Sequence, residues 1–99
     1  MIFYSFCPVN ATKSKLQAIA EFITKANYGM IIGNFELDFK DGEIRYKTSI
    51  DVEDETLTST LIKQLVFTNV AMMDKYLPGI RSIIEDNESP DEAISHVED

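Results

Sequence analysis

The sequence has no tryptophan and almost no cysteine: Cys7 is the only cysteine among its 99 residues. One cysteine cannot form a disulfide within the chain, which excludes a disulfide scaffold and favours a reducing compartment. No run reaches the ~18 apolar residues that a membrane span requires, and the stretch from Met1 to Pro8 lacks the basic and apolar regions of a signal peptide. We therefore expect a cytoplasmic protein that neither crosses nor binds a membrane.

Basic residues are also scarce, and the deficit falls in one half of the chain. Lysine and arginine number 9 against 17 aspartates and glutamates, for a net charge of −8. Residues 1–50 carry a net charge of +1 and residues 51–99 a net charge of −9. Because this balance repels phosphate backbones and anionic lipid surfaces, no nucleic-acid or membrane partner is expected. With 44% apolar residues, the chain is predicted to fold as a single domain, 1–99.

The first part of the chain predicts a strand and a helix. Bulky side chains alternate on both faces of residues 2–7, as in a covered strand, and Pro8 ends it. A helix is expected from a cap at Asn10 or Thr12 to about Tyr28, with an apolar stripe at helical spacing and Gly29 as its stop.

A β-hairpin between Phe35 and Val52 is the strongest local prediction. Alternating segments flank Asp41-Gly42, which is typical of a two-residue type I′ turn. That turn would set Lys40 opposite Glu43, Asp38 opposite Arg45 and Glu36 opposite Lys47 on one face. The other face would pair Phe39 with Ile44, Leu37 with Tyr46 and Phe35 with Thr48.

A long second helix is expected from a cap at Thr56 to about Leu77, stopped by Pro78-Gly79. Its apolar residues cover roughly 220° of the helix, more than one sheet face can bury. Ile80, Ile83 and Ile84 suggest one or two more helical turns, and Ser89-Pro90 predicts a short helix in the tail. The predicted fold is α+β, in the order β-α-β-β-α-α, with helices packed on one face of an antiparallel sheet.

Candidates for catalysis and metal binding are weak. Cys7 and His96 are the residues that a thiol enzyme would need, but they lie near opposite ends of the chain without a third orienting group. The acidic segment 51–55 lacks the glycine and the distal glutamate of a calcium loop. A solvated loop before a helix is the simpler interpretation, so we expect no enzyme, metal or cofactor.

Two asparagines fall within the apolar arcs of their helices: Asn27 and Asn69. A buried amide is costly unless it is hydrogen-bonded, so each should have a specific partner. Each is interpreted as a satisfied packing or capping residue, or alternatively as a polar residue that fixes register at a subunit interface. The Met72-Met73 pair is similarly either core filler or an adaptable binding surface.

Several motifs, in order along the chain, carry a resemblance to a known family. They are Asn27-Tyr28-Gly29, Gly33 to Asp38, Asp41 to Tyr46, Tyr76 to Ile80 and Ser89 to Ile94. Together, from about Phe3 to Val97, they resemble the YbjN-type family of bacterial sensory transduction regulators, especially its cyanobacterial members. The resemblance implies a fold similar to type III secretion chaperones and a non-enzymatic role through protein contacts. Family members usually have a helix and further strands before the segment that matches Ile2 to Val9, and without them the first strand would be an uncovered edge.

The favoured hypothesis is a chaperone-like regulator that binds a protein, as a homodimer or with another subunit. The expected partner-binding residues lie on the first strand and along the second helix: Ile2, Tyr4, Phe6, Asn69, Met72, Met73 and Tyr76. The alternative hypothesis is a small-molecule sensing module, with a pocket between helix and sheet near Tyr46, Phe35 and Met72.

Overall fold

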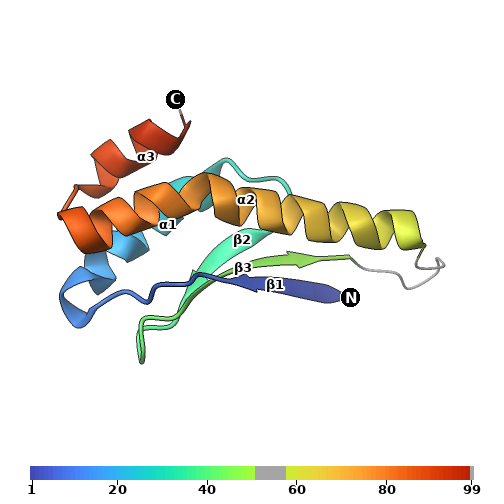
Figure 1. Ribbon diagram of the computed structural model, residues 1–99, viewed down its shortest axis with the longest axis horizontal. Helices are drawn as coiled ribbons and strands as arrows, with labels where there is room; N and C mark the ends of the chain where they lie inside the picture. The colour runs from blue at the N-terminus through green and yellow to red at the C-terminus, as the bar shows by residue number, and fades with distance from the viewer. Residues whose placement is uncertain (51–57, 99) are drawn as a thin grey trace.

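The computed structural model describes residues 1–50 and 58–98, and these form one α+β domain (Figure 1). The elements follow one another as β1 (Ile2–Phe6), a 3₁₀ turn (Lys13–Lys15), α1 (Leu16–Tyr28), β2 (Asn34–Leu37), β3 (Ile44–Ser49), α2 (Ser59–Asp86) and α3 (Pro90–Glu98). The expected cap at Thr56 and the acidic segment 51–55 lie outside the described residues.

The sheet has three antiparallel strands in the order β1-β3-β2, which confirms the predicted α+β class. Helix α2 packs on β1 and β3, α1 packs on β2, and α3 packs on the two longer helices (Figure 1). Phe35, Ile44 and Tyr46 point towards the helices and are buried. The residues that alternate with them on β2 and β3 remain in contact with solvent on the outer face of the sheet.

The hairpin register differs from the predicted one by two residues. Phe35 lies opposite Tyr46, Glu36 opposite Arg45 and Leu37 opposite Ile44. A shift of two residues leaves the paired side chains on their expected faces, because strand side chains alternate with a period of two. The predicted core and outer faces are therefore right for the paired residues of β2 and β3, although the predicted cross-strand pairs are wrong.

The turn explains the shift. A type I′ turn requires a positive φ at both central residues, but only Gly42 has one, at 76°. Instead, Asp38 Oδ1 accepts from the Lys40 N–H at 2.8 Å and Asp41 Oδ1 accepts from the Glu43 N–H at 2.9 Å, which makes a longer loop. Phe39, expected in the core opposite Ile44, is consequently 54% exposed in this loop.

The second helix continues through Pro78-Gly79, where it was expected to stop, and ends at Asp86. The proline removes one hydrogen bond, but the packing around Gly79 keeps the helix continuous. A Cβ on Gly79 would lie 2.7 Å from Phe22 Cζ, so glycine is what allows α1 to approach α2 here. Thr58 is the N-cap of this helix, and its side chain accepts from the Leu61 N–H; Asn87, in the left-handed conformation, is the C-cap.

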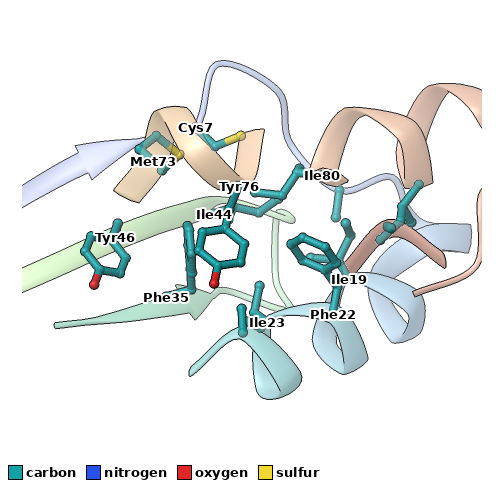
Figure 2. Close-up of a cluster of buried hydrophobic side chains, with 14 residues drawn as sticks. Cys7, Ile19, Phe22, Ile23, Phe35, Ile44, Tyr46, Met73, Tyr76 and Ile80 are labelled. Atoms are coloured by element: carbon teal, nitrogen blue, oxygen red, sulfur yellow. The ribbon is translucent and has the colours of Figure 1, made fainter. Parts of the chain in front are cut away.

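The core lies where α1, α2 and the sheet meet, as Figure 2 shows. The Tyr76 ring contacts Phe35 and Phe22 edge-on, with ring centroids 5.5 Å and 6.1 Å apart. Its hydroxyl donates to Glu98 Oε2 of α3 at 2.7 Å, so one residue joins the sheet and all three helices. The short tail helix was correctly predicted, and Ser89 Oγ accepts from the Glu92 N–H at its start.

Candidate functional site: the open edge and outer face of the sheet

The outer face of the sheet divides into an apolar and a charged part. On β1, Ile2 and Phe6 are each 57% exposed, and Tyr4 between them is half-buried. Arg45 of β3 lies over the Tyr4 ring, with its guanidinium carbon 4.3 Å from the ring centroid. Three of the residues expected to bind a partner, Ile2, Tyr4 and Phe6, therefore form one apolar row on a strand at the edge of the sheet.

The backbone of this row faces away from the rest of the sheet. Met1 and Ile50 exchange two hydrogen bonds of 3.0 Å, and the Cys7 N–H donates to the Ile44 carbonyl at 2.8 Å. In an antiparallel ladder the hydrogen-bonded residues alternate, so the odd-numbered residues of β1 bond to β3. The N–H and C=O groups of Ile2, Tyr4 and Phe6 therefore point to the free edge, where the described part of the chain provides no further strand.

The opposite edge of the sheet is closed at Phe35 by a side chain. The Phe35 N–H donates to Asn27 Oδ1 at 2.7 Å, and Asn27 Nδ2 donates to the Phe35 carbonyl at 3.0 Å. The Asn27 amide thus occupies the place of a neighbouring strand along the outer edge of β2. The expected specific partner of Asn27 is confirmed, and it lies within its own chain.

The expected partner of Asn69 is confirmed as well, and it also lies within the chain. Its Nδ2 group lies 3.0 Å from the carbonyl oxygens of Phe3 and Tyr46 and 3.1 Å from Thr48 Oγ1. Asn69 is fully buried above the seam between β1 and β3, and Met73 and Tyr76 are 5% and 3% exposed. In this fold, these three residues are buried within the chain.

The broad apolar arc of the second helix is largely covered by the chain itself. Its C-terminal half packs on α1 and α3, with Ile80 and Ile83 fully buried. Phe67 and Val70 are the large apolar residues of α2 that stay exposed, at 75% and 44%. The arc therefore leaves far less surplus surface than its width suggests.

A groove runs along α2, beside the segment between α1 and β2. Two cavities of about 490 and 450 Å³ lie there, and both are lined by Ile32 and Thr68. Met72 lines the larger one, whereas Phe35 and Tyr46, which were expected beside it, are buried beneath. The Tyr46 hydroxyl donates to the Ile32 carbonyl at 2.7 Å and so fixes the wall of the groove.

An exposed apolar patch near this groove was not predicted from the sequence. Tyr28 and Ile31 are 94% and 97% exposed, and Ile32 is 56% exposed. The signal was present, because Met30-Ile31-Ile32 is an apolar run between two glycines that belongs to no expected strand or helix.

The charged part of the outer face is centred on Glu36. Its carboxylate oxygens lie 2.7 Å from Arg45 Nε and 3.3 Å from Lys47 Nζ. Burial raises the pKa of Glu36, but the hydrogen bonds from Arg45 and Lys47 outweigh it and leave this pKa below its usual range. Glu36 is therefore paired with both cations, and the three side chains together keep one positive charge.

The residues considered for catalysis do not come together. Cys7 is 7% exposed, and burial raises the pKa of its thiol, which keeps it in the less nucleophilic protonated form. His96 stands on the exposed side of α3, with Nδ1 2.8 Å from Glu88 Oε1.

Within residues 1–50 and 58–98, no three histidine, cysteine, aspartate or glutamate side chains gather in a way that could hold a metal ion. In the same ranges, no helix combines the length and the apolarity that crossing a membrane demands.

Comparisons with known proteins match the chain to one family. The family model, described as "Putative bacterial sensory transduction regulator" (YbjN), covers residues 2–82. The match contains all three strands and α1 but ends before α3, so the motif Ser89 to Ile94 lies beyond it. Neither the curated proteins nor the solved structures gave a match, and the likeness to type III secretion chaperones stays a prediction. Since the matched range is most of the chain, this protein belongs to the YbjN family of bacterial sensory transduction regulators.

Proposed function

We propose that this protein is a non-enzymatic regulator that acts by binding protein, as a homodimer or with another subunit, through the apolar row Ile2, Tyr4 and Phe6. The family description, which names a regulator, supports this class of function. The observation that carries the proposal is that two large apolar side chains of β1, each 57% exposed, lie on a strand whose outer backbone groups face the free edge. Exposed apolar groups beside an open strand edge are typical of surfaces that bind another chain.

The remaining outer face contributes selectivity. Arg45 and Lys47 flank the apolar row, but both are paired with Glu36, so a charged partner must compete with these ion pairs and gains little from this surface. Contacts with the apolar row therefore supply most of the affinity, and the charged part disfavours partners that would leave its ion pairs buried and broken.

The test compares matched baits in a capture experiment. Tagged wild-type protein, Phe6→Asp and Phe67→Asp are each incubated with host lysate, and the bound proteins are quantified by mass spectrometry. Both phenylalanines are exposed, but Phe67 lies on α2 away from the apolar row. We expect a protein that is captured by the wild type and by Phe67→Asp, is lost with Phe6→Asp, and binds again when purified.

Equal capture by all three baits would argue against the apolar row as the binding surface. Circular dichroism and urea unfolding of the three baits exclude misfolding as the cause of a difference, because neither substitution alters a buried side chain.

A second candidate function is supported by the groove beside α2. Its cavities, about 490 and 450 Å³, are within the size range of small-molecule sites. Met30 and Met72 give the larger cavity apolar walls, Leu61 and Leu65 do so for the smaller one, and Ile32 lines both. In this role the protein would sense a small apolar metabolite. A thermal-shift screen of the wild type and of Thr68→Trp tests it, because the larger side chain fills the stretch that the two cavities share. A ligand that raises the melting temperature of both proteins equally would not occupy this groove.

A further inference from the structure

We infer that β1 pairs with the β1 strand of a second copy of this chain, antiparallel about a two-fold axis at Tyr4, so that two three-stranded sheets become one of six. This inference rests on the proposed function and names the partner for its binding surface. It also fixes a register: Tyr4 lies opposite Tyr4 of the second copy, and Ile2 lies opposite Phe6.

The backbone argument begins with the alternation already established. Ile2, Tyr4 and Phe6 direct both their N–H and C=O groups to the free edge, because the residues between them bond to β3. Two such edges related by a two-fold axis place each donor of one copy opposite an acceptor of the other. All three residues form hydrogen-bonded pairs, and no outward group of the strand is left over.

The side chains fit the same register. Antiparallel neighbours in a hydrogen-bonded pair have Cα atoms ≈ 5.5 Å apart, so Ile2 of each copy contacts Phe6 of the other. Both side chains are 57% exposed in the single chain, and pairing buries them on the outer face. Pro8 follows soon after Phe6 and cannot donate to a longer ladder, which limits the pairing to this short symmetric segment.

Charge also favours a second copy at this edge. No residue from Ile2 to Pro8 carries a charged side chain, whereas protected edges usually carry lysine or an inward charge. The half of the chain that contains β1 is nearly neutral, with a net charge of +1 for residues 1–50, while the acidic excess lies in residues 51–99. Two copies therefore meet through the part of the molecule with the least electrostatic repulsion.

The other edge does not offer an equivalent site. Along β2 the outward N–H and C=O groups of Phe35 are bonded to Asn27, so a strand could add there only after this amide was displaced. Pairing between copies is therefore directed to β1 and closes as a dimer, with no growth into longer assemblies.

The register is tested by a charge exchange at its two ends. Ile2→Lys combined with Phe6→Glu places lysine opposite glutamate twice in the dimer, whereas Ile2→Lys combined with Phe6→Lys places lysine opposite lysine. Within one chain these positions lie roughly 13 Å apart along the strand, so they cannot pair with each other. A glutamate at position 6 also lies opposite Arg45 of its own chain, which is why this polarity is chosen.

Sedimentation velocity from low to high micromolar concentration gives the dimer affinity of each protein. We expect the wild type to dimerise, the Lys/Lys variant to bind roughly tenfold or more weakly, and the Lys/Glu variant to regain much of the loss in low salt. Overall charge predicts the reverse order, because the Lys/Lys variant is closer to neutral than the net charge of −8. The order of the two variants therefore separates a paired register from a change in bulk charge.

Hydrogen exchange provides a second readout on the unmodified protein. The amides of Phe3 and Ser5, which bond to β3, should be protected at every concentration, whereas those of Tyr4 and Phe6 should gain protection only as the dimer forms.

A wild-type protein that stays monomeric, or a dimer unaffected by both double variants, would overturn the pairing. The proposed function would survive either outcome if the wild type, but not Phe6→Asp, still captured a partner protein. If the wild type neither dimerised nor captured a partner protein that Phe6→Asp fails to capture, both the β1 pairing and the proposed function would be overturned.

Discussion

The two edge strands of this sheet are each held by one asparagine from a helix, but with opposite results. Asn27 of α1 uses both its oxygen and its nitrogen on the outward backbone groups of Phe35, and so closes the edge at β2. Asn69 of α2 uses only its nitrogen, on the seam between β1 and β3, and so leaves the outer edge of β1 open. An asparagine amide thus blocks one edge of the sheet and leaves the other open.

The side chains on the outer face of the sheet also differ between the β2 edge and the β1 edge. Next to the closed edge, the outer face is charged, and Glu36 pairs there with Arg45 and Lys47. Next to the open edge, it is apolar and uncharged, with Ile2 and Phe6 exposed. In strand addition, free backbone groups supply hydrogen bonds to the added strand and neighbouring side chains select it, and the proposal assigns both roles to β1.

The largest expected effect comes from Asn69→Asp, which would detach the open edge from the helices. The replaced nitrogen faces the carbonyl oxygens of Phe3 and Tyr46, so a carboxylate there would be buried, unpaired and repelled. We expect a loss of about 3 to 5 kcal/mol in the free energy of unfolding, measured by urea denaturation at neutral pH. Asn87→Asp, the same change at an exposed helix end, is the control and should have little effect.

The next effect comes from Asn27→Ala, which would open the closed edge. It leaves the Phe35 N–H and C=O without their amide partner in a part-buried position, at an expected cost of about 2 to 3 kcal/mol. Asn27→Asp keeps the acceptor for the N–H and should be intermediate. For Asn27→Ala, light scattering should also show assemblies larger than dimers, because the edges at β1 and β2 would both be free. If Asn27→Ala unfolded no more easily than Asn34→Ala, whose side chain reaches the same carbonyl at 3.2 Å, Asn27 would not be what closes this edge.

Much of this comparison could be predicted from the sequence. Alternation placed Ile2, Tyr4 and Phe6 on one face, and it placed Phe35 and Tyr46 in the core despite a register that was wrong by two, because that error preserves the faces. The apolar arcs predicted that Asn27 and Asn69 need partners. Helix periodicity could not say whether those partners lie in the same chain, since that depends on which backbone groups the sheet leaves free.

The rest depended on contacts between distant segments. Asp38 and Asp41 choose a longer turn through their own side chains, and the Gly42 carbonyl accepts from the Ala11 N–H at 2.8 Å, a contact across the domain. Pro78 is a helix stop in local terms, but packing of Gly79 against Phe22 overrides it. Local propensity loses in both places to tertiary contacts that sequence spacing does not reveal.

The smallest expected effect concerns the charged part of the outer face and depends on pH. The pKa of Glu36 is lowered in the folded state, so its ion pairs stabilise the protein at pH values above the unfolded pKa of about 4.3, and that contribution is lost as the pH falls through the lower folded value. Glu36→Gln should therefore lower the free energy of unfolding at pH 7 by about 0.5 to 1 kcal/mol, a small value because the side chain is partly exposed. The difference from the wild type should disappear in strongly acidic solution, when urea unfolding is repeated along a pH series.

Glu21→Gln, at an exposed position on α1, is the matched control. A Glu36→Gln difference that stayed constant from pH 7 to acid would mean that the side chain acts through packing and not through its charge. The charged part of the outer face would then contribute to stability through packing alone, as the apolar row beside it does.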